Sequence, residues 1–163
     1  MIKQSSSNME YRYLGNSGLR VSVVSFGNFV NWNDETLCTE SVKYCLEHGI
    51  NFFDTAEVYG FGKAETLFGK AFKTLNVPRE KIVVSTKLFL NGPDPNDGNL
   101  SRKHIIEGLR LSLQKLQMDY VDVVFCHKYD RYTPLEETCR AFDWVVKQGW
   151  LIIGLLPPLQ HHR

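Results

Sequence analysis

Four titratable side chains follow strand-like segments of the sequence, and together they could protonate a carbonyl oxygen. Asp54 follows "INFF" with Tyr59 five residues later, Lys87 follows "IVVST", and His127 follows "VVFC". A free phenol has a pKa of about 10, and a neighbouring ammonium favours its charged form. A carboxylate can hold the ammonium, and an imidazole can orient the carbonyl. The set predicts proton donation while a cofactor delivers a hydride, because no side chain supplies one.

Each of these residues, taken alone, also has an ordinary structural explanation. The aspartate could cap a turn, the tyrosine could lie at the rim of the surface, the lysine could be a solvated strand end, and the histidine could be a satisfied loop residue. Four such residues after successive strands are harder to explain in this way, because the loops after parallel strands build the active sites of α/β folds. No G-x-G-x-x-G or P-loop motif occurs, so we expect no Rossmann-type binding of a nicotinamide.

Strand and helix signals alternate along the chain and would bring the four side chains to one edge of a sheet. We predict strands at Val21–Phe29, 50–57, 81–88 and 119–127, helices at Asp34–Gly49, 63–75, 101–116 and 134–149, and the start of a fifth strand in "WLIIGLL". Asp34 and Ser101 are suited to cap the first and third helices. Apolar strands joined by helices predict an α/β fold with a parallel sheet, either doubly wound or a barrel.

Composition favours one globular domain and excludes several classes of partner. The 163 residues are 43% apolar and 23% charged, with a net charge of +1. This balance gives no reason to expect nucleic acid as a partner, and the apolar runs are far shorter than the roughly 20 residues that span a bilayer, so no membrane insertion is expected. The N-terminus has no hydrophobic signal region, which predicts a cytoplasmic location. Cys38, Cys45, Cys126 and Cys139 form no C-x-x-C pair, so we expect free buried thiols and no metal site.

The strand-end motifs resemble those of the aldo-keto reductase superfamily. "GINFFDTAEVYG", "IVVSTK" and "DYVDVVFCH" match its second, third and fourth strand motifs. The resemblance implies a (β/α)8 TIM barrel that binds NADPH at the carboxyl ends of its strands and reduces aldehydes or ketones. It also implies that Tyr59 is the general acid, assisted by Lys87, Asp54 and His127.

The same resemblance points to residues that contact the cofactor. Asn28, Phe29 and Asp54 stand at the matching positions, although the family usually has a hydroxyl residue where this chain has Asn28. Trp32 is a further candidate for lining the pocket, with a surface aromatic as the alternative.

Several stretches are more similar to one branch of that superfamily, the β-subunits of voltage-gated potassium channels with their microbial and plant relatives. These stretches are "AEVYGFGKAE", "LSRKHIIEGLRLSL" and "LQMDYVDVVF", while "YRYLGNSGLRVSVVSFG" resembles the first hairpin and first barrel strand of the superfamily. The alternative function that this branch implies is a regulatory β-subunit that docks on a channel. His127 favours chemistry, because some channel subunits carry another polar residue there.

The length predicts only part of such a barrel, which takes about 250 residues. We expect residues 1–10 to be a disordered tail, 11–149 the N-terminal half with four βα units, and 150–163 an aberrant tail. Relatives continue as Gly-Trp-Ala-Tyr-Tyr-Trp-Ala-Thr-Ser, and deleting one base from a coding sequence for this stretch can yield Trp150 to Pro157. We interpret the tail as an out-of-frame translation, with splicing or a retained intron as alternatives. Half a barrel has unpaired edges, which predicts self-association and an inactive isolated chain.

Overall fold

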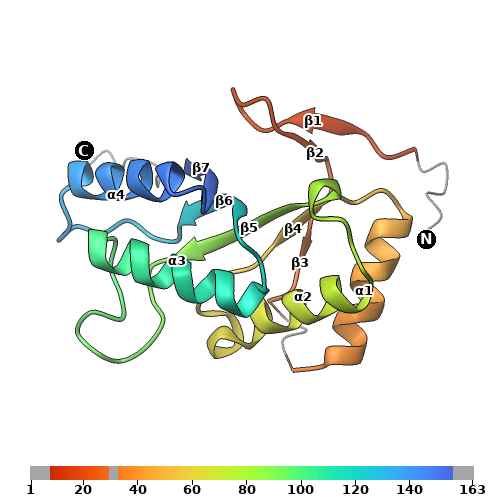
Figure 1. The fold of residues 1–163 in the computed structure, drawn as a ribbon, viewed down its shortest axis with the longest axis horizontal. Coiled ribbons are helices and arrows are strands. Elements are labelled where there is room, and N and C mark those ends of the chain that lie inside the picture. The colour runs from red at the N-terminus through yellow and green to blue at the C-terminus, as the bar shows by residue number, and fades with distance from the viewer. Residues whose placement is uncertain (1–7, 30–32, 156–163) are drawn as a thin grey trace, which may run out of the picture.

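A parallel five-stranded sheet forms the centre of the molecule in the computed structural model, which describes residues 8–29 and 33–155. Its strands, in spatial order, are β3 (Phe26–Gly27), β4 (Phe52–Asp54), β5 (Val83–Leu88), β6 (Val121–Cys126) and β7 (Leu151–Leu155). All neighbouring pairs are parallel, and a helix follows each of β3 to β6 (Figure 1). The predicted α/β fold, as the first units of a barrel plus a fragment of the next, is confirmed.

The helices form where apolar residues recur with helical spacing, and two of them begin at a capping side chain. They are α1 (Glu35–Glu47), α2 (Lys63–Thr74), α3 (Arg102–Leu116) and α4 (Leu135–Lys147), with short 3-10 turns η1 (Tyr59–Gly62) and η2 (Arg79–Lys81). The predicted caps are confirmed: Asp34 accepts a hydrogen bond from the amide of Leu37, and Ser101 accepts one from the amide of His104. Throughout the described part of the chain, the helices lack the combination of length and apolar character that crossing a bilayer requires.

The two faces of the sheet are packed differently. On the helix side, Val84 and Val124 join a large core cluster with the buried faces of all four helices. On the opposite side, Val83 and Val123 pack with Val21 in a small second cluster. This alternation is expected of strands whose successive side chains point to opposite faces.

The predicted first strand, Val21–Phe29, is wrong as a single element. The structure divides it into β2 (Arg20–Ser22), which pairs antiparallel with β1 (Tyr11–Tyr13), and β3, which joins the parallel sheet. The chain turns between them, where the Ser22 hydroxyl donates to the carbonyl of Val24 and both valines of the turn are exposed. A run of β-formers does not reveal such a turn, because the same residues suit either sheet.

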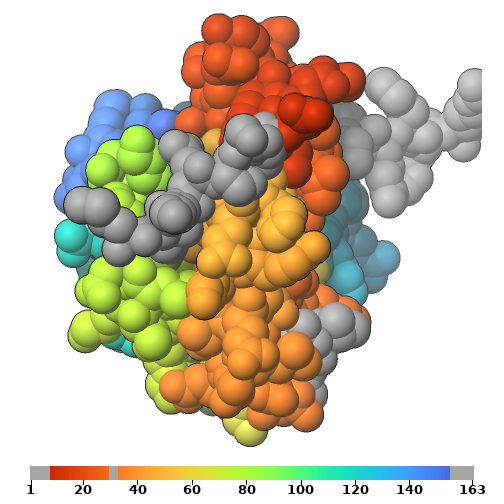
Figure 2. Space-filling view, turned by 90° about the vertical axis from the view of Figure 1, so that its right-hand side faces the viewer, coloured from red at the N-terminus to blue at the C-terminus, as the bar shows by residue number. Residues whose placement is uncertain are grey.

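The hairpin formed by β1 and β2 is fastened beside α1. The Tyr11 hydroxyl donates to the carbonyl of Gly49, just beyond the end of α1, at 2.7 Å. Figure 2 shows the corresponding face, with the hairpin in red above α1 in orange.

The predicted fifth strand is confirmed, since β7 pairs with β6. Gly154 lets α4 approach this strand, because a Cβ there would lie 2.8 Å from the Phe142 ring. The rest of the predicted aberrant tail, residues 156–163, lies outside the described residues, as do residues 1–7 of the predicted N-terminal tail.

The cysteine prediction needs one correction. All four thiols are free, and Cys38, Cys45 and Cys126 are buried, but Cys139 is exposed on α4. Burial raises the pKa of Cys126 to about 12, so this thiol stays protonated near neutral pH.

A buried ion pair connects the starts of β5 and β6, the strands that lead to Lys87 and His127. Arg79 donates to Asp122 at 2.5 Å, and the same carboxylate oxygen accepts a bond from the amide of Val84 at 2.8 Å. The Asp122 side chain is 9% exposed. Such a carboxylate is stabilised only while both donors remain in place.

We predict that Asp122→Ala lowers the free energy of unfolding by about 3 kcal/mol, because it leaves a largely buried guanidinium without its counter-ion. Chemical denaturation followed by circular dichroism would measure this change. The control is Asp143→Ala, which breaks an exposed pair with Lys147 on α4 and should cost less than about 0.5 kcal/mol. Equal effects of the two substitutions would contradict the assignment.

Candidate active site

The four side chains singled out in the sequence come together at one edge of the sheet. In the parallel register, Asp54 lies opposite Ser85 on β5, and Lys87 lies opposite Phe125 on β6. Strands β5 and β6 end level, with Leu88 opposite Cys126, and β4 ends slightly earlier, so the loops that follow these parallel strands leave from the same edge of the sheet. All four side chains are partly buried and keep some contact with solvent, so a ligand can reach them.

An ion pair holds the ammonium at this edge. Lys87 Nζ donates to Asp54 Oδ2 at 2.5 Å and to the carbonyl oxygen of Thr55 at 2.7 Å. The Ser85 hydroxyl donates to the other carboxylate oxygen at 2.6 Å. The lysine and aspartate side chains are only 16% and 28% exposed, so the low local dielectric strengthens the attraction.

The Tyr59 ring lies directly against this ammonium. Lys87 Nζ is 4.8 Å from the centroid of the ring, which is the geometry of a cation–π contact. The His127 ring packs edge-on against the same tyrosine, with centroids 5.8 Å apart, and the Phe29 ring does so at 4.9 Å. The structure therefore groups Tyr59 with Lys87 and His127, two of its three predicted partners, and with Phe29, one predicted cofactor contact.

His127 has its position and its protonation set by the same surroundings. Its amide donates to the carbonyl of Leu88, which ties the end of β6 to the end of β5. Burial lowers the pKa of His127 below its usual 6.5, and the charges of Lys87 and Lys128 lower it further. Near neutral pH the imidazole is therefore uncharged, with one nitrogen that donates and one that accepts.

The other predicted cofactor residues are placed differently. Asn28 is fully buried, and its side-chain amide donates to the carbonyl of Ala64 on α2 at 2.6 Å, so this side chain is not exposed to solvent. Phe29 is 62% exposed beside Tyr59. Trp32 lies outside the described residues.

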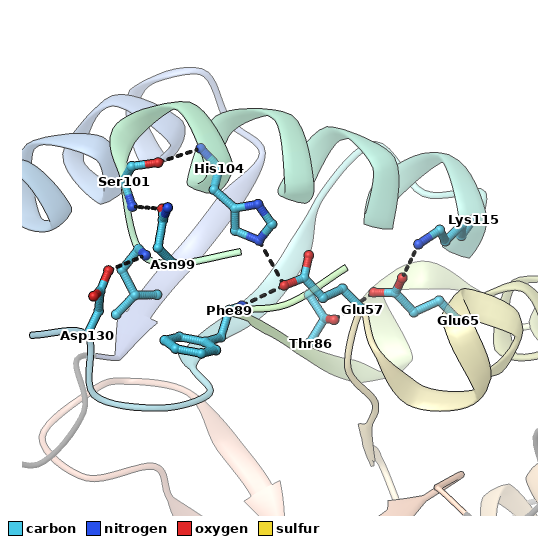
Figure 3. Close-up of polar contacts among 10 residues, drawn as sticks. Glu57, Glu65, Thr86, Phe89, Asn99, Ser101, His104, Lys115 and Asp130 are labelled. Atoms are coloured by element: carbon cyan, nitrogen blue, oxygen red, sulfur yellow. Dashed lines mark hydrogen bonds and ion pairs between the residues drawn. The ribbon is translucent and has the colours of Figure 1, made fainter. Parts of the chain in front are cut away.

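Sequence reasoning missed a buried network on the helix side of this edge, drawn in Figure 3. Glu57 and Glu65 are both fully buried; Glu57 bonds to His104 on α3, and Glu65 bonds to Thr86 on β5. Burial raises the pKa of Glu65, which is countered by hydrogen bonds from hydroxyl groups and by the Lys115 charge. A signal was available: Glu65 lies three positions before Phe68, on the apolar face of its helix.

Clusters of three or more metal-ligating side chains with suitable geometry are absent from residues 8–29 and 33–155.

Comparisons with known proteins agree with this geometry. The sequence pattern of the Aldo/keto reductase family matches residues 24–152. The chain is 50% identical over 145 residues to a protein of Arabidopsis thaliana, and 52% identical over 144 residues to one of Oryza sativa subsp. japonica, both named "Probable voltage-gated potassium channel subunit beta". These alignments cover 87% and 86% of this chain but 44% of each relative, so the chain spans less than half of their length.

A solved structure supports the same assignment. An aldo-keto reductase from Bacillus halodurans, in its holo form, superposes with a TM-score of 0.82 at 33% sequence identity. The superposition covers 91% of this chain and 50% of that protein. Since the family pattern spans most of the described sheet and its helices, this chain belongs to the aldo/keto reductase family.

Proposed function

We propose that this chain contributes the proton-donating part of an NADPH-dependent oxidoreductase site that reduces aldehyde or ketone carbonyls. Membership of the aldo/keto reductase family supports an oxidoreductase in general. The observation that carries the proposal is the contact of Tyr59 with an ammonium that Asp54 holds in place. A phenol beside a fixed cation, at a solvent-accessible edge of a parallel sheet, suits donation of a proton to a carbonyl oxygen.

The residues at this edge fit a nicotinamide cofactor. The cluster holds proton donors but no group that can give a hydride, and NADPH supplies a hydride when it is bound. Phe29 and Asp54 would hold it, since Phe29 packs against Tyr59, Asp54 pairs with the Lys87 ammonium that contacts this ring, and both keep solvent contact. Asn28 would contribute through its main chain, because its side chain is buried and bonded to Ala64.

The remaining roles follow from charge and position. Tyr59 would give its proton to the carbonyl oxygen, and the Lys87 charge would stabilise the phenolate left behind. Asp54 would keep the ammonium oriented through its 2.5 Å contact. His127, uncharged near neutral pH, would orient the carbonyl oxygen through its N–H.

We test the role of Tyr59 in a chimera, where this chain replaces the matching half of the Bacillus halodurans aldo-keto reductase. We expect the chimera to oxidise NADPH when an aldehyde is added, and Tyr59→Phe to lower kcat roughly 100- to 10,000-fold, because the proton donor is lost. NADPH absorbance measures the rate.

The matched control is Tyr44→Phe, which removes the same hydroxyl from an exposed tyrosine on α1 and should leave the rate unchanged. We expect the 163-residue chain alone to bind NADPH weakly and to turn over little, since it spans 44% of its plant relatives. A folded chimera without turnover, or full activity of Tyr59→Phe, would reject the proposal.

The protonation of His127 gives a second test, which needs no cofactor. We expect its imidazole to titrate below 6.5 by NMR, so that it becomes charged only in more acidic solution. Lys87→Met should raise this pKa part of the way back, because a repelling charge is removed while burial remains. Lys147→Met, on the exposed side of α4, should leave it unchanged. A titration at or above 6.5 in the unmodified chain would contradict the role of a neutral donor.

A regulatory β-subunit of a potassium channel is the second candidate function. It is favoured by the 50% and 52% identity to two plant proteins that carry this name. We expect a chimera completed with the remainder of the Arabidopsis thaliana relative to co-purify with the cytosolic domain of a plant potassium channel. Binding by the unaltered relative combined with no binding by the chimera would exclude this function for the present chain.

A further inference from the structure

Glu57 is a fully buried carboxylate that lies two residues before Tyr59 in the loop after β4. A charged side chain with no solvent contact is costly unless hydrogen bonds replace its hydration. The groups that bond to Glu57 therefore indicate which segments of the chain it connects. Figure 3 shows its side chain directed toward Phe89 and His104, on the helix side of the sheet.

Two hydrogen bonds of Glu57 reach Lys87 and the residue two positions after it. Its own amide donates to the carbonyl of Lys87 at 3.2 Å. Its Oε1 accepts a hydrogen bond from the amide of Phe89, two residues further on, at 2.5 Å. The loop that carries Tyr59 is thereby fastened to the chain at the lysine itself and two residues after it.

Helix α3 fixes this carboxylate from the other side. His104 Nε2 bonds to the same Oε1 at 2.9 Å, and the imidazole is itself only 4% exposed. Gly108, one turn further along α3, provides the space, because a Cβ there would lie 3.1 Å from Glu57 Oε2. The side chain therefore has little freedom to move.

We infer that Glu57 is a positioning residue that sets the Tyr59 ring against the Lys87 ammonium. The inference rests on the proposed function, in which that contact prepares the proton donor. Glu65 provides the comparison: it is equally buried, but it joins α2 to Thr86 within β5, where ladder hydrogen bonds already fix the backbone. Burial of a carboxylate is therefore not sufficient for it to hold the loop that carries Tyr59.

The contact between Lys87 and Tyr59 can be measured directly in the full chain. We expect an NMR cross-relaxation signal between the methylene group next to Lys87 Nζ and the Tyr59 ring. Glu57→Ala should abolish it, because the loop loses its bond to Phe89. Glu57→Gln should retain it, because its amide oxygen can accept the same two bonds. Glu65→Ala, the matched control, should retain it even where it destabilises the fold.

Hydrogen exchange of the Phe89 amide provides a second measurement. It tests the positioning role of Glu57 even if Glu57→Ala does not fold. This amide lies beyond the end of β5, and its hydrogen bond is to Glu57 Oε1. Because this bond protects the amide, we expect slow exchange in the unmodified chain and in Glu57→Gln. Fast exchange in the unmodified chain, or equal loss of the Lys87–Tyr59 signal in Glu57→Ala and Glu65→Ala, would overturn the positioning role. Neither measurement needs NADPH or turnover, so an inactive chimera with the expected signals would reject only the proposed function.

Discussion

The ion pair between Lys87 and Asp54 is the interaction on which the candidate site depends. Two partly buried charges are stable together only when their geometry is good and further hydrogen bonds satisfy their remaining polar atoms. The parallel register of β4 and β5 provides this, and the Ser85 hydroxyl and Thr55 carbonyl satisfy the remaining polar atoms. With the ammonium fixed, the tyrosine in the next loop has a definite place beside it.

The side chains of β5 point alternately to the candidate site on one face of the sheet and to the buried hydrogen-bond network on the other. Its residues Ser85 and Lys87 face Asp54, whereas Thr86 between them faces the opposite side and bonds to Glu65. Successive side chains of a strand point to opposite faces, so one short segment serves both layers. The reactive layer keeps contact with solvent, while the supporting layer is fully buried among helices, where its carboxylates can be held without competing water.

The sequence allowed prediction of what depends on local pattern. The strand ends near Asp54 and Leu88, and the caps Asp34 and Ser101, follow from composition and spacing that neighbouring residues determine. The features that could not be predicted depend on contacts between residues that are far apart in the sequence. The amide of Asn28 finds a carbonyl on α2, and the strand predicted at Val21–Phe29 divides between two sheets. The pairing of Glu57 with His104, 47 positions apart, likewise requires α3 to be in place.

The turn that begins at Tyr59 has a strained backbone, which the chain on its N-terminal side must hold in place. Gly60, Phe61 and Gly62 all have positive φ, at 57°, 55° and 84°, and Phe61 is almost fully exposed, so no packing of its own ring holds it. A left-handed conformation costs a residue other than glycine about 1 kcal/mol and persists only where the surroundings impose it. Glu57 fastens the chain before this turn to the amide of Phe89, whereas Glu65 joins the following helix α2 to Thr86 of β5. The exposed turn can therefore keep a strained shape because Glu57 holds the chain that enters it.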